Sequence, residues 1–175
     1  MTDRLAEETS ALVEDYLRHC VNPGAEPPLG PAAQTLRRVA GEVLVGNLSS
    51  IESCCDRLTA EPKDVLRNVA EQMPLEGGLN WGRVVALIAF AGLLTESRTG
   101  EHRPGTPKEL AEVLTQFLAV EHREWLQRSG GWDGFYKSFN KNGIRGGQES
   151  SAVSNALMAA AGFGLAGLAF ILAVR

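Results

Sequence analysis

The sequence predicts an all-α protein, and three observations predict it. Apolar residues recur at helical spacing along nearly the whole chain, and no stretch alternates apolar and polar residues long enough to indicate a sheet. Residues 84–94 are apolar without interruption, so this helix has no polar face for solvent and belongs at the centre of a bundle. Residues 150–174 carry no charged side chain and form a second long apolar segment. We expect a helical bundle over residues 1–148 and a separate C-terminal helix over residues 150–174.

The C-terminal segment has the length of a membrane anchor. A transmembrane helix needs roughly 20 predominantly apolar residues, and residues 150–174 meet that need and are followed by Arg175. The first twenty residues contain several acids and no apolar central run, which argues against a secretory signal peptide. The sequence therefore predicts a transmembrane C-terminal helix that tethers a cytosolic domain of about 150 residues, the size of one single-core unit.

The composition limits which cellular compartments and which classes of partner fit this protein. The net charge is −4 and no run of lysine or arginine is long enough to follow a phosphate backbone, so we expect no nucleic-acid partner. The chain has three cysteines, Cys20, Cys54 and Cys55, and the last two are adjacent, a spacing that disfavours a bridge between them. We interpret all three as free thiols in a reducing compartment.

The first half of the bundle contains three expected helices. One covers about residues 3–19 and stops before Asn22-Pro23, and a link rich in proline and glycine continues to Pro31. A second helix begins near Ala32 and fades around residues 46–50 into a polar stretch. A third begins with Pro62 as its first residue and continues until Pro74, with one apolar stripe formed by Val65, Leu66, Val69, Ala70 and Met73.

The second half contains the apolar helix 84–94 and two more. Thr106-Pro107-Lys108-Glu109 is the pattern of a capping box with proline at the first helical position, and it predicts a helix start. The apolar spacing continues this helix through Trp125 and Leu126 until Gly130-Gly131 breaks it. A final short helix is expected over residues 132–139.

The inventory of reactive side chains argues against an enzyme. His19, His102 and His122 lie in different segments, and no zinc-binding, nucleophile or phosphate-loop motif accompanies them. We therefore expect no metal, no cofactor and no small-molecule substrate.

The start of the apolar helix holds the candidate recognition residues. Asn80 is a good N-cap, Trp81 has a large apolar side chain, and Gly82 permits close backbone approach. Arg83 is unusual because a cation in the first turn faces the positive end of the helix dipole. An anion should compensate it, either in an internal salt bridge or as the carboxylate of a bound partner, and the sequence leaves both open.

These residues resemble the Bcl-2 family of apoptosis regulators. Asn80-Trp81-Gly82-Arg83 with the apolar run behind it looks like the first homology motif of that family, and Trp125-Leu126 with residues 130–135 looks like the second. Glu14-Asp15-Tyr16 resembles the N-terminal homology helix. Within the family, residues 154–164 and the short first loop resemble the Bcl-2-like-10 and Nr-type branch that includes Nrz and Diva, in cellular or virus-encoded form. The resemblance implies a Bcl-2-like helical bundle with a central buried hydrophobic helix.

One departure concerns the third homology motif. Family members in which this motif is active carry a leucine, then a small residue four positions on, then aspartate. Here Leu36 and Ala40 are followed by Gly41, and Glu42 comes one position late. The resemblance therefore implies a protein that protects cells by capturing the death-motif helices of others rather than one that donates its own.

The implied binding site is a hydrophobic groove that accepts an amphipathic helix. The resemblance implies that Arg83 and Asn80 bind the partner's acid and its neighbouring polar atoms, with Gly82 between them. The apolar floor and walls would come from Leu44, Leu48, Leu66, Val69, Met73, Val85, Ala86 and Phe90, and Phe139 would close one side. Ordinary core packing is the alternative role for each of these apolar residues.

The implied partners are pro-apoptotic relatives, namely Bax, Bak and the Bim-like and Bad-like death-motif proteins. Capture would block permeabilisation of the mitochondrial outer membrane, and the tail would place the protein on the cytosolic face of that membrane or of the endoplasmic reticulum. The alternative is a pro-apoptotic or membrane-active member, pore-forming or calcium-regulating, because residues 84–94 and the next helix form an apolar hairpin. The many charges of that next helix argue against it.

Overall fold

The computed structural model describes residues 3–42, 61–72, 79, 81–95 and 106–140, and every regular element within them is helical. The prediction of an all-α bundle is thus confirmed for this part of the chain. The elements are α1 (Arg4–Val21), a second helix over residues 31–42, α3 (Pro62–Gln72), α4 (Trp81–Leu94), α5 (Pro107–Thr115), the π-helix η1 (Gln116–Glu121), α6 (Arg123–Arg128) and α7 (Gly131–Asn140).

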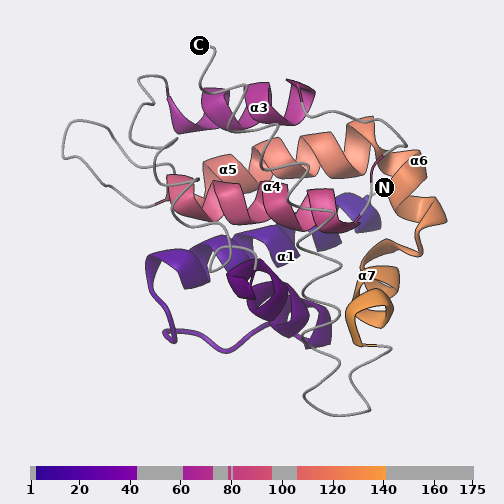
Figure 1. Ribbon diagram of the computed structural model, residues 1–175, viewed down its shortest axis with the longest axis horizontal. Helices are drawn as coiled ribbons and strands as arrows, with labels where there is room; N and C mark the ends of the chain where they lie inside the picture. The colour runs from indigo at the N-terminus through magenta and orange to yellow at the C-terminus, as the bar shows by residue number, and fades with distance from the viewer. Residues whose placement is uncertain (1–2, 43–60, 73–78, 80, 96–105, 141–175) are drawn as a thin grey trace.

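Helix α4 occupies the centre of the bundle, as its uninterrupted apolar sequence predicts. Every residue from Gly82 to Leu94 is buried. Figure 1 shows α4 between α3 on one side and α1 on the other, with α5 alongside. Fully burying one valine, leucine, isoleucine or phenylalanine contributes about 1.5–3 kcal/mol, so α4 supplies much of the free energy that holds the bundle together.

Helix α1 packs closely against α4 at Gly92. A Cβ atom added to Gly92 would lie 2.8 Å from Sγ of Cys20 and 3.1 Å from the Tyr16 hydroxyl oxygen, so glycine permits this helix contact. Helix α1 begins at Arg4 after the N-cap Asp3, and it extends to Val21, two residues beyond the predicted end. It ends there because Pro23 disfavours helical backbone in the residue before it.

A connector of nine residues, 22–30, leads from α1 to the second helix. Gly24 has a φ of 80°, a conformation that glycine adopts without strain. The second helix is fixed to α1 by a two-pronged ion pair, in which Arg37 Nε donates to Asp15 Oδ2 at 3.2 Å and Nη2 donates to Oδ1 at 3.0 Å. Both side chains are largely buried, with exposures of 12% and 5%.

The helix that follows the capping box is the clearest departure from the sequence prediction. The capping box itself is confirmed, since Thr106 Oγ1 accepts from the Glu109 amide and the Glu109 carboxylate accepts from the Thr106 amide. The single predicted helix, however, is divided into α5, the π-helix η1 and α6. The His122 amide donates to the Phe117 carbonyl oxygen at 3.0 Å, an i to i+5 bond that accommodates one extra residue in the turn.

Two glycines with positive φ reverse the chain between α6 and α7. Gly130 has a φ of 87° and Gly131 a φ of 63°, which confirms the predicted break. Gly134 permits the tight turn, because a Cβ atom on it would lie 2.0 Å from the Ser129 carbonyl oxygen. Helix α7 begins at Gly131 and ends at Asn140, one residue longer at each end than predicted.

The described residues contain no helix long and apolar enough to cross a membrane. Residues 150–174, the predicted anchor, lie outside the described part of the chain, as does the polar stretch after the second helix. The anchor therefore stays a prediction.

Candidate partner-helix site

Helices α3 and α4 bring five of the predicted groove residues into one cluster. Leu66 and Val69 lie on the inward face of α3, and Val85, Ala86 and Phe90 lie on α4. All five have exposures of 1% or less and belong to the same hydrophobic core. These side chains are covered in this structure, so a partner helix can contact them only after they have been uncovered.

Arg83 lies in the first turn of α4, where the sequence places it, and Gly82 precedes it. The Arg83 side chain is 8% exposed, so the guanidinium group is held within the protein rather than free in solvent. A buried cation is costly unless it is paired and hydrogen-bonded. Such burial fits either role that the sequence leaves open, an internal ion pair or contact with a partner's carboxylate, and the second stays a prediction.

Trp81 joins the two sequence motifs into one structural unit. Its ring centroid lies 4.8 Å from that of Trp125, 5.6 Å from that of Trp132 and 5.3 Å from that of Phe135. Aromatic pairs at such separations contribute about 0.5–1.5 kcal/mol each beyond their area burial. The turn that carries Arg83 is therefore packed directly against α6 and α7.

Phe139 continues this aromatic cluster along α7. Its ring lies 5.1 Å from Phe135, and its exposure is 9%. The Phe139 carbonyl oxygen accepts a long hydrogen bond of 3.4 Å from Arg38 of the second helix. Phe139 thus sits where α7 meets the second helix, and its predicted role in closing a groove is not tested by this geometry.

Two further hydrogen bonds attach α7 to the bundle. Trp132 Nε1 donates to Thr9 Oγ1 of α1 at 2.8 Å, and both groups are buried. Asn140 Nδ2 donates to Thr35 Oγ1 of the second helix at 2.8 Å. Because buried polar groups must be hydrogen-bonded, these pairs fix the rotation of α7.

The misplaced acid of the third homology motif has an internal partner. Glu42 Oε1 lies 3.5 Å from Arg38 Nη1, one helical turn earlier. Leu36, Val39 and Ala40 of the same helix are fully buried. The second helix is therefore integrated into the core of the bundle.

Four predicted site residues lie outside the described part of the chain, namely Leu44, Leu48, Met73 and Asn80. The structure also shows one feature that the sequence patterns do not predict, the aromatic contact between Trp81 and the α6–α7 region. The available signal was the presence of tryptophan in both motifs, and helical spacing alone does not reveal that these rings meet.

Comparison with known proteins now identifies the family. Residues 36–132 match the model of apoptosis regulator proteins of the Bcl-2 family. The whole chain aligns with the whole of anti-apoptotic protein NR13 from Coturnix japonica at 45% identity over 178 residues. Human Bcl-2-like protein 10 is 32% identical, over 79% of this chain and 78% of its own length.

The fold matches a solved relative as well. The structure of a zebrafish pro-survival protein, NRZ, in complex with Bad BH3 superimposes with a TM-score of 0.65 and 30% sequence identity. The match covers 77% of this chain and 94% of the zebrafish chain. Sequence motifs, helix arrangement and relatives agree, and the chain belongs to the Bcl-2 family.

Proposed function

We propose that this protein is an anti-apoptotic regulator that captures the death-motif helices of pro-apoptotic relatives in a groove between α3, α4 and α7. The observation that carries this proposal is the fold match to NRZ in complex with Bad BH3, at 30% identity over 94% of that chain. The 45% identity to anti-apoptotic protein NR13 over the full length supports the protective direction. Bax, Bak and Bim-like or Bad-like proteins are the proposed partners.

The recognition chemistry follows from Arg83 and the apolar faces. A death-motif helix presents apolar side chains at i, i+3 or i+4 spacing, and one aspartate on the same side. The apolar side chains would enter between Leu66, Val69 and Phe90, and the aspartate would meet Arg83. Since these α3 and α4 side chains are at most 1% exposed, capture includes a movement that uncovers them.

The direct test is calorimetric titration of the protein with a Bad BH3 peptide. Replacement Arg83→Ala should weaken binding by about 2–5 kcal/mol, the range for removing one partner of a buried charge pair. Arg67→Ala is the matched control, because Arg67 is an exposed arginine of α3, and it should bind as the unmodified protein does. Equal affinity of the Arg83 variant, with unchanged helicity, would assign Arg83 an internal role instead.

The cellular test asks whether protection depends on capture. Cells that express the full chain should survive overexpression of Bax or Bak, and Gly82→Glu should abolish both binding and survival. The added carboxylate would stand beside Arg83 in a buried position and occupy the place of the partner's acid. A folded Gly82→Glu variant that no longer binds and still protects would refute capture and favour the membrane-active alternative. Death on expression of the unmodified protein would overturn the protective role.

We propose in addition that residues 150–174 anchor the protein and that residues 1–148 form the cytosolic unit. The absence of charge from the segment supports this proposal. The cytosolic face of the mitochondrial outer membrane or the endoplasmic reticulum is the proposed location. The same composition, with no metal or nucleotide motif, supports a binding function without catalysis.

A further inference from the structure

Helix α7 is held near both ends by buried threonine hydroxyl groups on two other helices. Near its start, Trp132 Nε1 donates to Thr9 Oγ1 of α1 at 2.8 Å. At its last residue, Asn140 Nδ2 donates to Thr35 Oγ1 of the second helix, also at 2.8 Å. The two threonines are 0% and 3% exposed. The two attachments lie on different helices, so each can be removed separately by one substitution.

The hydrogen bond between Asn140 and Thr35 has a defined direction. The Thr35 hydroxyl donates its one hydrogen to the Pro31 carbonyl oxygen at 2.9 Å, so it accepts from Asn140. The Asn140 amide also donates to the Tyr136 carbonyl oxygen at 2.8 Å, which uses its second N–H. Removing the Thr35 hydroxyl therefore leaves one Asn140 N–H without its acceptor.

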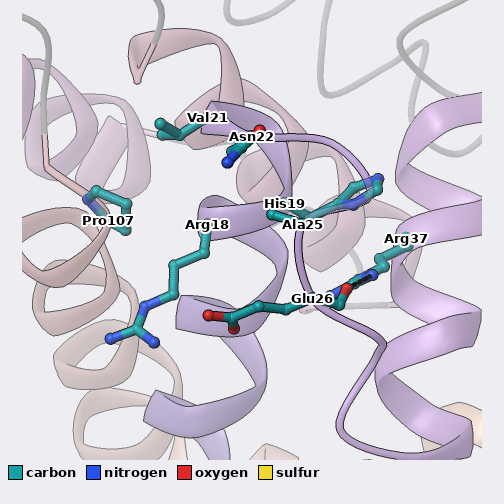
Figure 2. A pocket seen from close by; sticks show the side chains of 8 residues that line it. All are labelled: Arg18, His19, Val21, Asn22, Ala25, Glu26, Arg37 and Pro107. Atoms are coloured by element: carbon teal, nitrogen blue, oxygen red, sulfur yellow. Dashed lines mark hydrogen bonds between the residues drawn. The ribbon is translucent and has the colours of Figure 1, made fainter.

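The second helix gives this contact a firm support. Arg37 joins it to α1 through the two hydrogen bonds to Asp15, and Arg37 Nη1 donates to the Glu26 carbonyl oxygen at 3.1 Å. Figure 2 shows the Arg37 side chain directed from the second helix toward Glu26 of the connector. Leu36 of the same helix is fully buried. Thr35 thus lies on a helix that is itself fixed within the bundle.

Phe139 depends on this contact because it lies in the last turn of α7. Helix ends fray, since their last four carbonyl groups have no donor within the helix. Here the Phe139 carbonyl oxygen accepts from Arg38 at 3.4 Å, and the next residue, Asn140, is held by Thr35. The Phe139 ring packs against Phe135, with centroids 5.1 Å apart. The contact with the second helix therefore keeps the last turn formed and the ring in place.

We propose that Thr35 and Asn140 are positioning residues for capture of a partner helix, because they hold Phe139 at the side of the groove. This role rests on the proposed function, in which Phe139 forms one wall of the groove. A side chain that is already held in its binding position loses less conformational freedom when a partner binds, so this preorganisation raises affinity. Thr9 has no such role, since it holds α7 near the opposite end.

The test is calorimetric titration of the full chain in neutral detergent with a Bad BH3 peptide. Thr35→Val, which keeps the shape of the side chain and removes the hydroxyl, should weaken binding about fivefold, the equivalent of one lost hydrogen bond. Thr35→Ser retains the hydroxyl and should bind as the unmodified chain does. Ser138→Ala is the matched control in α7, because the exposed Ser138 hydroxyl donates to the Gly134 carbonyl oxygen of its own helix. It should leave affinity unchanged.

A double-mutant cycle separates positioning from a general loss of stability. If Thr35 acts through Phe139, Thr35→Val should cause no further loss of affinity in a Phe139→Ala protein. Thr9→Val removes a similar buried hydroxyl, which also donates to a carbonyl one turn earlier, that of Leu5 at 2.7 Å. Any effect of Thr9→Val on affinity should add in full to that of Phe139→Ala. Asn140→Ala removes the donor at a partly exposed position and should weaken binding as Thr35→Val does.

Three results would overturn the positioning role. They are unchanged or tighter binding by Thr35→Val or Asn140→Ala, weakened binding by Thr35→Ser, and full additivity of Thr35→Val with Phe139→Ala. Each of them leaves the proposed function standing as long as the unmodified chain binds the peptide and Arg83→Ala weakens binding. Absence of binding by the unmodified chain would refute the proposed function, and the positioning role with it.

Discussion

At the scale of single residues, the ion pair between Asp15 and Arg37 is the main polar contact between α1 and the second helix. Its two hydrogen bonds of 3.0 and 3.2 Å form within a largely buried setting. Removing one partner of a buried pair leaves an uncompensated charge, which typically costs about 3–5 kcal/mol. We therefore expect Arg37→Ala to lower the free energy of unfolding by about that amount in urea denaturation.

The surface pair on the same helix provides the control for this measurement. Arg18 meets Glu14 at 2.8 Å, but the Arg18 side chain is 58% exposed. Such i, i+4 surface pairs contribute only about 0.3–0.5 kcal/mol. Arg18→Ala should thus leave the free energy of unfolding nearly unchanged. An equal loss of this free energy in the Arg37→Ala and Arg18→Ala variants would show that the buried pair contributes no more than the surface pair.

His19 makes the stability of the protein sensitive to pH. Its pKa in the folded state is lowered from 6.5 by burial and by Arg37, against a smaller opposing effect of Asp15. Below pH 6.5 the unfolded chain therefore binds a proton that the folded chain does not, so the contribution of His19 is complete above that pH and is lost as the pH falls. Its Nδ1 atom is buried without a hydrogen-bond partner, which fits a ring held neutral.

The measurement is the free energy of unfolding between pH 7.5 and 5 for the unmodified chain and for His19→Gln. We expect the unmodified chain to lose more stability over this interval than the variant does. Parallel curves for the two proteins would show that His19 titrates alike in the folded and unfolded states.

At the scale of helices, the turn between α6 and α7 depends on Gly134. A Cβ atom there would lie 2.0 Å from the Ser129 carbonyl oxygen, and backbone atoms cannot move aside at little cost. Gly134→Ala should displace α7 and break the buried Trp132–Thr9 hydrogen bond. The expected result is a lower unfolding temperature and a changed tryptophan fluorescence spectrum.

Gly41 provides a control position, because replacing it by alanine should raise stability rather than lower it. It lies in the second helix, and a Cβ atom on it would meet nothing within 4 Å. Replacing such a helical glycine by alanine restricts the unfolded chain and stabilises by about 0.4–1 kcal/mol. A Gly134→Ala protein as stable as Gly41→Ala would contradict the tight turn.

At the scale of the whole molecule, much of the bundle could be predicted because its signals are local. The capping box of Thr106 and Glu109 and the apolar run of α4 each follow from a few adjacent residues. The π-helix could not be predicted, since the spacing of Phe117 and Leu118 suits an α-helix equally well. The Asp15–Arg37 pair could not be predicted from the sequence either, because two helices of mixed charge allow many ion pairs until their packing is known.

The separation into bundle and anchor can be tested in cells with a truncated chain. Deleting residues 150–175 should move the protein from membranes to the cytosol, because it removes the long uncharged segment. Carbonate washing of membranes followed by immunoblotting measures this. A truncated chain that stays with washed membranes would require a second attachment site in the bundle.

The π-helix η1 holds one residue more in its turn than an α-helix would, so it acts as a one-residue insertion between α5 and α6. Each residue of an α-helix advances the chain by about 100° around the axis. In the π-helix a similar total rotation is spread over one more residue, so deleting the exposed residue Val120 would allow one continuous α-helix from Pro107 in which the side chains beyond the deletion keep their directions relative to α5. Trp125 would then still face Trp81, so the π-helix lets the chain carry one extra residue between the two homology motifs without breaking their contact.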